Sequence, residues 1–113
     1  MPFINSRITV KLSDEKKDAI KAKLGQACGI IGKPEAYVMI GFEDDYCLYF
    51  AGEKLEKGAF VSVDLLGSPN SAAFEKMTAK ICEIYAEELG IPGDHIYVEY
   101  QTTRDWGWNG RNF

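Results

Sequence analysis

Pro2 is the residue with the most distinctive potential chemistry, because a proline behind the initiator methionine becomes an N-terminal secondary amine once Met1 is removed. An α-amino group titrates at about 8 in model peptides, and burial or a neighbouring cation lowers its pKa by disfavouring the charged form. Such an amine is a base near neutral pH. The alternative interpretation is structural, with Pro2 as the stiff first residue of an edge strand. While Met1 is retained, the Pro2 nitrogen is a non-basic amide.

Composition excludes several classes of partner. The 113 residues, 46% of them hydrophobic, suit a single domain over 1–113. Asp and Glu number 17 against 13 Lys and Arg, and the net charge of −4 argues against nucleic acid. No run approaches the ~20 apolar residues of a membrane span, and no signal-peptide pattern is present. The expected location is therefore the cytoplasm, with leaderless secretion left open.

The three cysteines, Cys28, Cys47 and Cys82, are odd in number, widely spaced and in no CxxC pair. Neither a disulfide framework nor a zinc site is expected from this spacing. We predict that they are reduced and mostly buried. The lone His95 has no second His or Cys at metal-ligand spacing, so no metal is expected.

Two similar stretches supply the elements that must position the reactive residues. Alternating apolar residues predict a strand over 2–10, and Ser13 followed by two acids predicts the start of an amphipathic helix that ends before Pro34. Strands are then predicted over 36–42 and 47–51. In the second half, the pattern predicts a strand over 59–66, a helix that ends at Gly90 and a strand over 96–101.

These stretches look like duplicated β-α-β units, with pseudo-repeats roughly over 1–55 and 56–113. Tyr37 and Tyr97 each follow a helix, a glycine and a proline, and stand sixty positions apart. Because such crossovers are right-handed, the two long strands of each repeat should be parallel. We therefore predict an α/β fold in which a four-stranded mixed sheet carries both helices on one face, with additional short strands. Its open face and edges should meet other subunits.

Four segments, in this order and spacing, carry a resemblance to a known family: Met1-Pro2, Gly32-Lys33-Pro34, Ile96-Tyr97-Val98, and Gly107-Trp108-Asn109-Gly110 through Phe113. From end to end the chain resembles the macrophage migration inhibitory factor (MIF) family of the tautomerase superfamily. The resemblance implies a homotrimer with active sites at subunit interfaces. It also implies keto–enol tautomerisation of α-keto acids such as phenylpyruvate, with no cofactor and with Pro2 as the catalytic acid and base.

The same resemblance implies roles for residues around Pro2. Lys33 would hold the substrate carboxylate and lower the pKa of the Pro2 amine, and the backbone N–H of Leu66 would meet the same carboxylate. Tyr97 would reach in from a neighbouring subunit, and period two places Glu99 on the same strand face. Structural alternatives remain, with Lys33 as a solvated residue at a helix C-terminus and Tyr97 as packing.

Glu99 and Trp106 depart from better-studied vertebrate members, which carry an asparagine and often a small aliphatic residue at these positions. In the site, Glu99 would repel a second negative charge on the substrate and accept a hydrogen bond from a phenolic hydroxyl, while Trp106 would narrow the pocket. Trp106 and Phe113 match apolar pocket positions of the family, although interface packing explains them equally well. We expect ring-bearing keto-acid substrates with an altered preference.

Two other functions stay open at this level. Some members of the family act as cytokines or cytokine mimics, so a protein that binds a receptor is the main alternative. Within the superfamily, hydration, dehalogenation or decarboxylation uses the same proline with additional arginines. Arg7 and Arg104 are the candidates for those arginines here.

Overall fold

The computed structural model describes residues 1–113 and contains a four-stranded mixed sheet with two helices on one face. In chain order the elements are β1 (Pro2–Ile8), α1 (Asp14–Ala27), the 3₁₀ helices η1 (Cys28–Ile31) and η2 (Glu35–Tyr37), β2 (Met39–Glu43), β3 (Tyr49–Phe50), β4 (Glu53–Lys54), β5 (Ala59–Leu66), α2 (Ser71–Leu89), the 3₁₀ helix η3 (Gly93–His95), β6 (Ile96–Thr103), β7 (Gly107–Trp108) and β8 (Arg111–Asn112).

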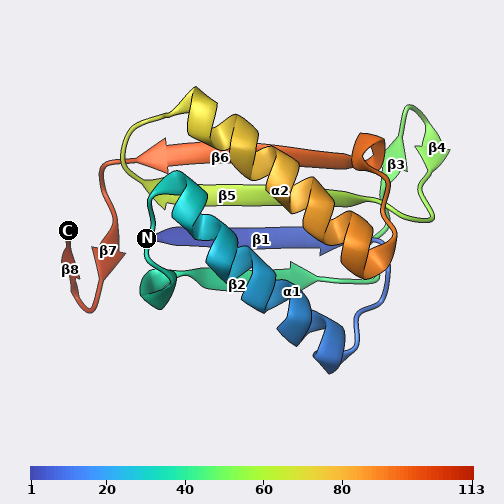
Figure 1. Ribbon diagram of the computed structural model, residues 1–113, viewed down its shortest axis with the longest axis horizontal. Helices are drawn as coiled ribbons and strands as arrows, with labels where there is room; N and C mark the ends of the chain where they lie inside the picture. The colour runs from blue at the N-terminus through green and yellow to red at the C-terminus, as the bar shows by residue number, and fades with distance from the viewer.

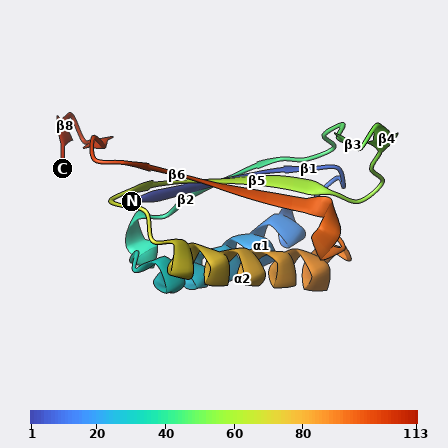
Figure 2. The same ribbon diagram turned by 90° about the horizontal axis from the view of Figure 1, so that it is seen from above.

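The main sheet has the strand order β2-β1-β5-β6. Strands β1 and β2 are parallel, as are β5 and β6, while β1 and β5 pair antiparallel in the centre. Both helices lie on the same side of the sheet, which leaves the other face uncovered (Figure 2). The predicted fold class is confirmed. None of the helices has the length and apolar character needed to cross a membrane.

The core lies between the sheet and the helices, and the strands alternate between the two environments. In β1, Ile4 and Ile8 are fully buried toward the helices, and in β5, Val61 and Val63 are too. The hydroxyl groups of Ser6 and Tyr85 are both buried in this layer, and Ser6 accepts a hydrogen bond from Tyr85 at 2.6 Å. Burial raises the pKa of Tyr85 to about 12.

The helix boundaries follow the predicted capping chemistry. The Ser13 hydroxyl accepts a hydrogen bond from the backbone N–H of Lys16 and caps α1, and the Asn70 side chain does the same for α2 through Ala73. At the other ends, Gly32 closes the α1–η1 segment and Gly90 closes α2, both in the left-handed conformation.

Several predicted boundaries were wrong. Strand β1 ends at Ile8 and does not extend to residue 10, and residues 35–37 form η2, so β2 begins only at Met39. The strand predicted over 47–51 is reduced to the two residues of β3, which pair with β4 (Glu53–Lys54), a strand that the sequence pattern did not predict. The prediction of mostly buried thiols fails at Cys47, which is exposed, while Cys28 is buried.

The short strands form two hairpins at opposite ends of the sheet (Figure 1). Hairpin β3–β4 lies near the starts of β5 and β6, where Phe50 packs against Tyr97 at a centroid distance of 5.4 Å. Hairpin β7–β8 extends past the end where the N-terminus lies. The N-terminal end of the sheet therefore also gathers the last turn of α1, the first turn of α2 and the C-terminus.

Candidate functional site

Pro2 opens β1 at this crowded end of the sheet. It lies opposite Leu65 in the antiparallel pairing, and its ring is fully buried on the helix-facing side. A proline suits this position because the first residue of a strand loses little when it cannot donate to the ladder. The burial fixes the position of the backbone nitrogen, which is what a base at this place requires.

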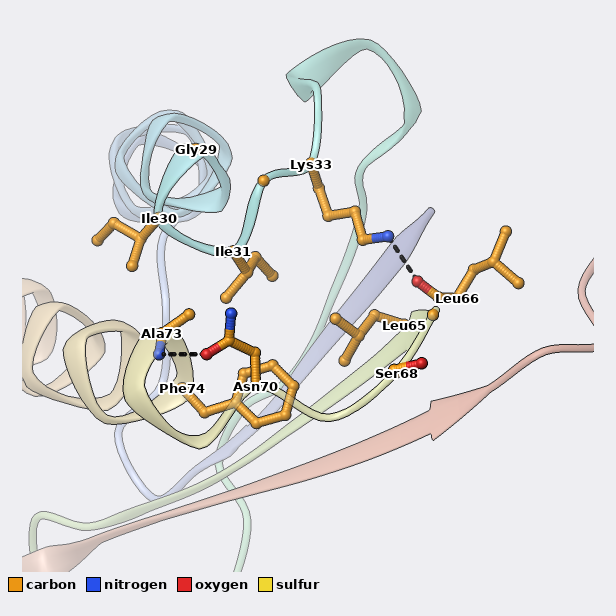
Figure 3. A pocket seen from close by; sticks show the side chains of 12 residues that line it. Gly29, Ile30, Ile31, Lys33, Leu65, Leu66, Ser68, Asn70, Ala73 and Phe74 are labelled. Carbon is orange, nitrogen blue, oxygen red and sulfur yellow. Dashed lines mark hydrogen bonds between the residues drawn. The ribbon is translucent and has the colours of Figure 1, made fainter.

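The Lys33 side chain also extends to this end of the sheet, where it lies near the amino terminus. Its ammonium donates a hydrogen bond of 2.5 Å to the carbonyl oxygen of Leu66, the last residue of β5 (Figure 3). The backbone of Lys33 is held as well, because its N–H donates to the carbonyl of Cys28 at 3.0 Å and Gly32 before it adopts φ +70°. The sequence-predicted pair of Lys33 and Leu66 is thus brought together.

Met1 accepts a hydrogen bond from the Leu66 N–H, the donor that the family resemblance assigns to the substrate carboxylate. The backbone N–H of Leu66 donates to the carbonyl oxygen of Met1 at 3.3 Å. With Met1 in place, this donor is therefore already used, and the Pro2 nitrogen is an amide. Removal of Met1 would free the donor and create the amine in one step.

The electrostatics at the amino terminus favour a neutral amine. Partial burial lowers the pKa of the Met1 amino group, and the nearby Lys33 ammonium lowers it further. The thiol of Cys28 acts in the opposite direction only as a thiolate, but burial raises the pKa of Cys28 to about 11, so the thiol is neutral at pH 7. An amine one residue later, on Pro2, would sit beside the same cation.

An aromatic cluster lies at this end of the sheet, and the sequence prediction missed two of its members. The Tyr37 ring meets Trp108 edge-on at a centroid distance of 6.0 Å, and Trp108 stacks on Phe113 at 5.9 Å. Only Phe113 was predicted as a site residue. The clue to Trp108 was the C-terminal segment itself, in which Trp108 lies on β7 and Phe113 directly follows β8.

Trp106 is placed near this cluster through the backbone. Its carbonyl oxygen accepts a hydrogen bond from the N–H of Phe113 at 3.0 Å, which closes the base of hairpin β7–β8. The Trp106 side chain is half-buried, whereas 54% of Phe113 is exposed. Phe113 is thus available to a ligand or a second chain.

Tyr97 and Glu99 are not brought to Pro2 within one chain. Both face the open side of β6, as period two predicted, and Gln101 donates to the Glu99 carboxylate at 3.3 Å. Tyr97 lies opposite Phe60, five positions along β5 from the residue that pairs with Pro2. At about 3.3 Å per residue, this separation is about 17 Å. Only a second chain could bring these side chains to the Pro2 end.

This end of the sheet therefore combines three groups suited to one reaction. It has a backbone nitrogen that would become an amine on removal of Met1, a cation held against the end of β5, and a cluster of aromatic side chains. No cluster of three or more His, Cys, Asp or Glu side chains that could hold a metal ion is present. The arrangement suits proton transfer next to a carboxylate.

Comparisons with known proteins extend over the whole chain. A family model described as macrophage migration inhibitory factor (MIF) matches residues 1–113. A MIF homolog of Trichinella spiralis is 26% identical over 115 residues, with 100% of both chains covered. A Xenopus laevis MIF is 29% identical over 119 residues, covering 100% of this chain and 99% of that protein. The crystal structure of Leishmania major MIF2 matches with a TM-score of 0.93 at 37% identity, covering 100% of this chain and 97% of that one.

Proposed function

The chain belongs to the macrophage migration inhibitory factor family, and from this premise we propose that it is a cofactor-independent keto–enol tautomerase of α-keto acids such as phenylpyruvate. The observation that supports the proposal best is the convergence of the amino terminus and the Lys33 ammonium on Leu66. A base and a cation that both lie beside Leu66 suit a substrate whose acidic C–H lies next to a carbonyl and a carboxylate.

The proposed reaction moves one proton. The neutral Pro2 amine removes a proton from the carbon beside the substrate carbonyl, and the electron pair shifts to the carbonyl oxygen as the enolate forms. Lys33 and the Leu66 N–H hold the carboxylate and fix the orientation. The protonated amine, or water, then supplies the proton to oxygen, and the reverse sequence returns the keto form. A base whose pKa lies near neutral pH serves both directions.

The complete site is proposed to require a homotrimer. Along the strand direction, Tyr97 lies about 17 Å and Glu99 about 10 Å from the level of Pro2, so we expect them to reach a Pro2 only on a neighbouring subunit. The open face and edge carry large exposed apolar side chains, including Met39 at 68% and Tyr97 at 60% exposure. Such side chains favour burial against another copy of the chain.

Glu99 is proposed to set the substrate preference at that interface. Its carboxylate would accept a hydrogen bond from a phenolic hydroxyl and repel a substrate with two carboxylates. In Glu99→Asn, turnover of a hydroxyphenyl keto acid should fall relative to that of phenylpyruvate. Equal turnover ratios in wild type and variant would remove Glu99 from the site.

The test of the activity is tautomerisation of phenylpyruvate followed by ultraviolet absorbance. Three preparations are compared at equal concentration: protein whose mass confirms loss of Met1, protein that retains Met1, and processed Pro2→Ala. General acid–base catalysis contributes about 10²- to 10⁴-fold, so the second and third preparations should be slower by at least 10²-fold.

The oligomeric state of each preparation is measured by light scattering, because a site at a subunit interface is lost with the assembly. Activity of processed wild type no greater than that of an equally assembled Pro2→Ala variant would overturn the proposal. A role in binding a receptor would then be the leading alternative.

A further inference from the structure

A cavity of about 340 Å³ lies beside the sequence-predicted site and shares Lys33 and Leu66 with it. It is enclosed by η1 with the following turn, by the end of β5 with the following loop, and by the first turn of α2 (Figure 3). Its size is within the range of small-molecule sites. Neither Pro2 nor any residue of the aromatic cluster lines it.

The lining has one charge and no acid. Six of the twelve lining residues are hydrophobic, and Lys33 is the single charged side chain among them. Asn70 and Ser68 add neutral polar groups. The Asn70 side-chain oxygen is used by the N–H of Ala73 at 3.1 Å, which leaves its amide nitrogen as a donor. By contrast, the neighbouring groove between the helices carries Lys23, Lys80 and Glu87, with charges of both signs.

One wall of the cavity is held rigidly by the sheet. Phe74 stacks on Tyr100 with a centroid distance of 4.4 Å and an angle of 4° between the rings. The Tyr100 hydroxyl donates to the carbonyl of Phe74 at 3.0 Å and lies 2.8 Å from the Thr78 hydroxyl. Because these contacts order the wall before any ligand arrives, little entropy is lost there on binding.

We propose that this cavity is a second ligand site for a small monocarboxylate with an apolar body. The apolar body would lie among Ile31, Leu65 and Phe74, and the carboxylate would pair with the Lys33 ammonium. Because Lys33 is shared with the proposed active site, a ligand here competes with the substrate for the same cation and inhibits. The inhibition rests on the proposed function, whereas the binding does not.

The binding test uses phenylacetate as the probe and phenylacetamide as its uncharged match. Ala73→Leu fills the cavity from the first turn of α2, and Ala72→Leu places the same side chain at the exposed neighbouring position outside the lining. By calorimetric titration, phenylacetate should bind wild type and Ala72→Leu alike, and Ala73→Leu at least tenfold more weakly. Equal affinities for the two variants, or for the two probes, would overturn the proposal.

Wild-type protein provides a test that needs no variant. In a methyl-labelled sample, phenylacetate should give nuclear Overhauser contacts to Ile31 and Leu65. Contacts limited to the aromatic cluster of Tyr37, Trp108 and Phe113 would place the probe in the proposed active site and overturn a second site.

Kinetics distinguish this site from the substrate pocket. In Ala73→Leu, phenylacetate inhibition should weaken at least tenfold, while kcat/KM for phenylpyruvate stays within about twofold of wild type. A parallel rise in the KM for phenylpyruvate would show that the cavity belongs to the substrate site. Phenylacetate should still bind to Pro2→Ala. The calorimetric binding test would therefore remain valid even if the protein had no tautomerase activity.

Discussion

The turn after α1–η1 and the turn after α2 have nearly the same backbone. Gly32 has φ 70° and ψ 25°, and Gly90 has φ 67° and ψ 27°. Each glycine is followed by one residue, then by a proline in an extended conformation, a 3₁₀ helix and a strand of the main sheet. The closing hydrogen bonds are similar in kind but not in register, because Lys33 donates its backbone N–H to Cys28, five residues back, and Ile91 donates to Tyr85, six residues back.

The difference between the turns is the residue after the glycine. Ile91 is fully buried in the core, whereas Lys33 is half-buried and sends its ammonium over the end of β5. The same backbone thus makes a structural joint in one place and aims a cation in the other. The shared turn is therefore expected to govern stability, and the side chain at its second position to govern function.

Ile91→Ala should give the largest effect on stability. Truncation of a fully buried isoleucine costs about 2–5 kcal/mol, from lost transfer free energy and the cavity left behind. Urea denaturation should show this loss, while kcat/KM per folded molecule stays near that of wild type. A loss of activity in the folded variant comparable to that of a Lys33 variant would show that both turns serve the site.

Lys33→Met should give the opposite result. A hydrogen bond to a charged group contributes about 1.5–3 kcal/mol, so kcat/KM for phenylpyruvate should fall about tenfold to a hundredfold. Methionine preserves much of the apolar stem, and the urea midpoint should therefore change little. Lys33→Arg is the matched control, since it retains the charge. Equal losses in both variants would point to a geometric role for Lys33.

Lys33→Met should also shift the pH dependence of kcat/KM. The base must be neutral to accept a proton, so kcat/KM should rise with pH through the pKa of the Pro2 amine. Burial and the Lys33 ammonium lower the pKa of the amino group at this end of the chain. Loss of the cation should raise the pKa of the Pro2 amine, which moves the rising limb of the profile to higher pH. An unmoved limb in Lys33→Met would show that burial alone sets this pKa.

Sequence patterns predicted the elements best where local chemistry decides the structure. Ser13 caps α1 and Gly90 ends α2 as expected, because each cap depends on one residue and its neighbours. The strand predicted over 36–42 fails at its start. Its residues are uniformly apolar, but the N–H of Val38 bonds to the carbonyl of Glu35 and forms a 3₁₀ turn. Apolar composition alone does not distinguish these outcomes.

The candidate site was predictable only in part, because its groups converge through tertiary structure. Period two placed Tyr97 and Glu99 on one face of β6, and their exposure confirms this. The sequence of side chains does not show which partners the backbone groups will find, so the hydrogen bond from the Leu66 N–H to the Met1 carbonyl was not predicted. The sequence predicted two residues of the cavity lining, Lys33 and Leu66, but not the cavity itself, since three segments distant in sequence enclose it.

Substitution of the two glycines should give the smallest and most discriminating effects. At φ near +70°, an added Cβ costs about 1 kcal/mol from backbone strain, so Gly32→Ala and Gly90→Ala should lower the free energy of unfolding by similar amounts. A Cβ at Gly32 meets no atom within 4 Å, and one at Gly90 meets only the flexible end of Lys57. Strain therefore dominates both changes.

Activity should separate the two glycines. In Gly32→Ala, we expect relief of the strain to turn the backbone at Lys33 and to move its ammonium away from the Leu66 carbonyl, to which it bonds in the wild-type chain. Gly32→Ala should thus lower kcat/KM several-fold in the folded protein, whereas Gly90→Ala should not, because Ile91 has no part in the reaction. Asparagine tolerates the left-handed conformation better than alanine, so Gly32→Asn should recover much of both losses. Equal activities of the two alanine variants would mean that the side chain of Lys33 finds its position without help from the turn.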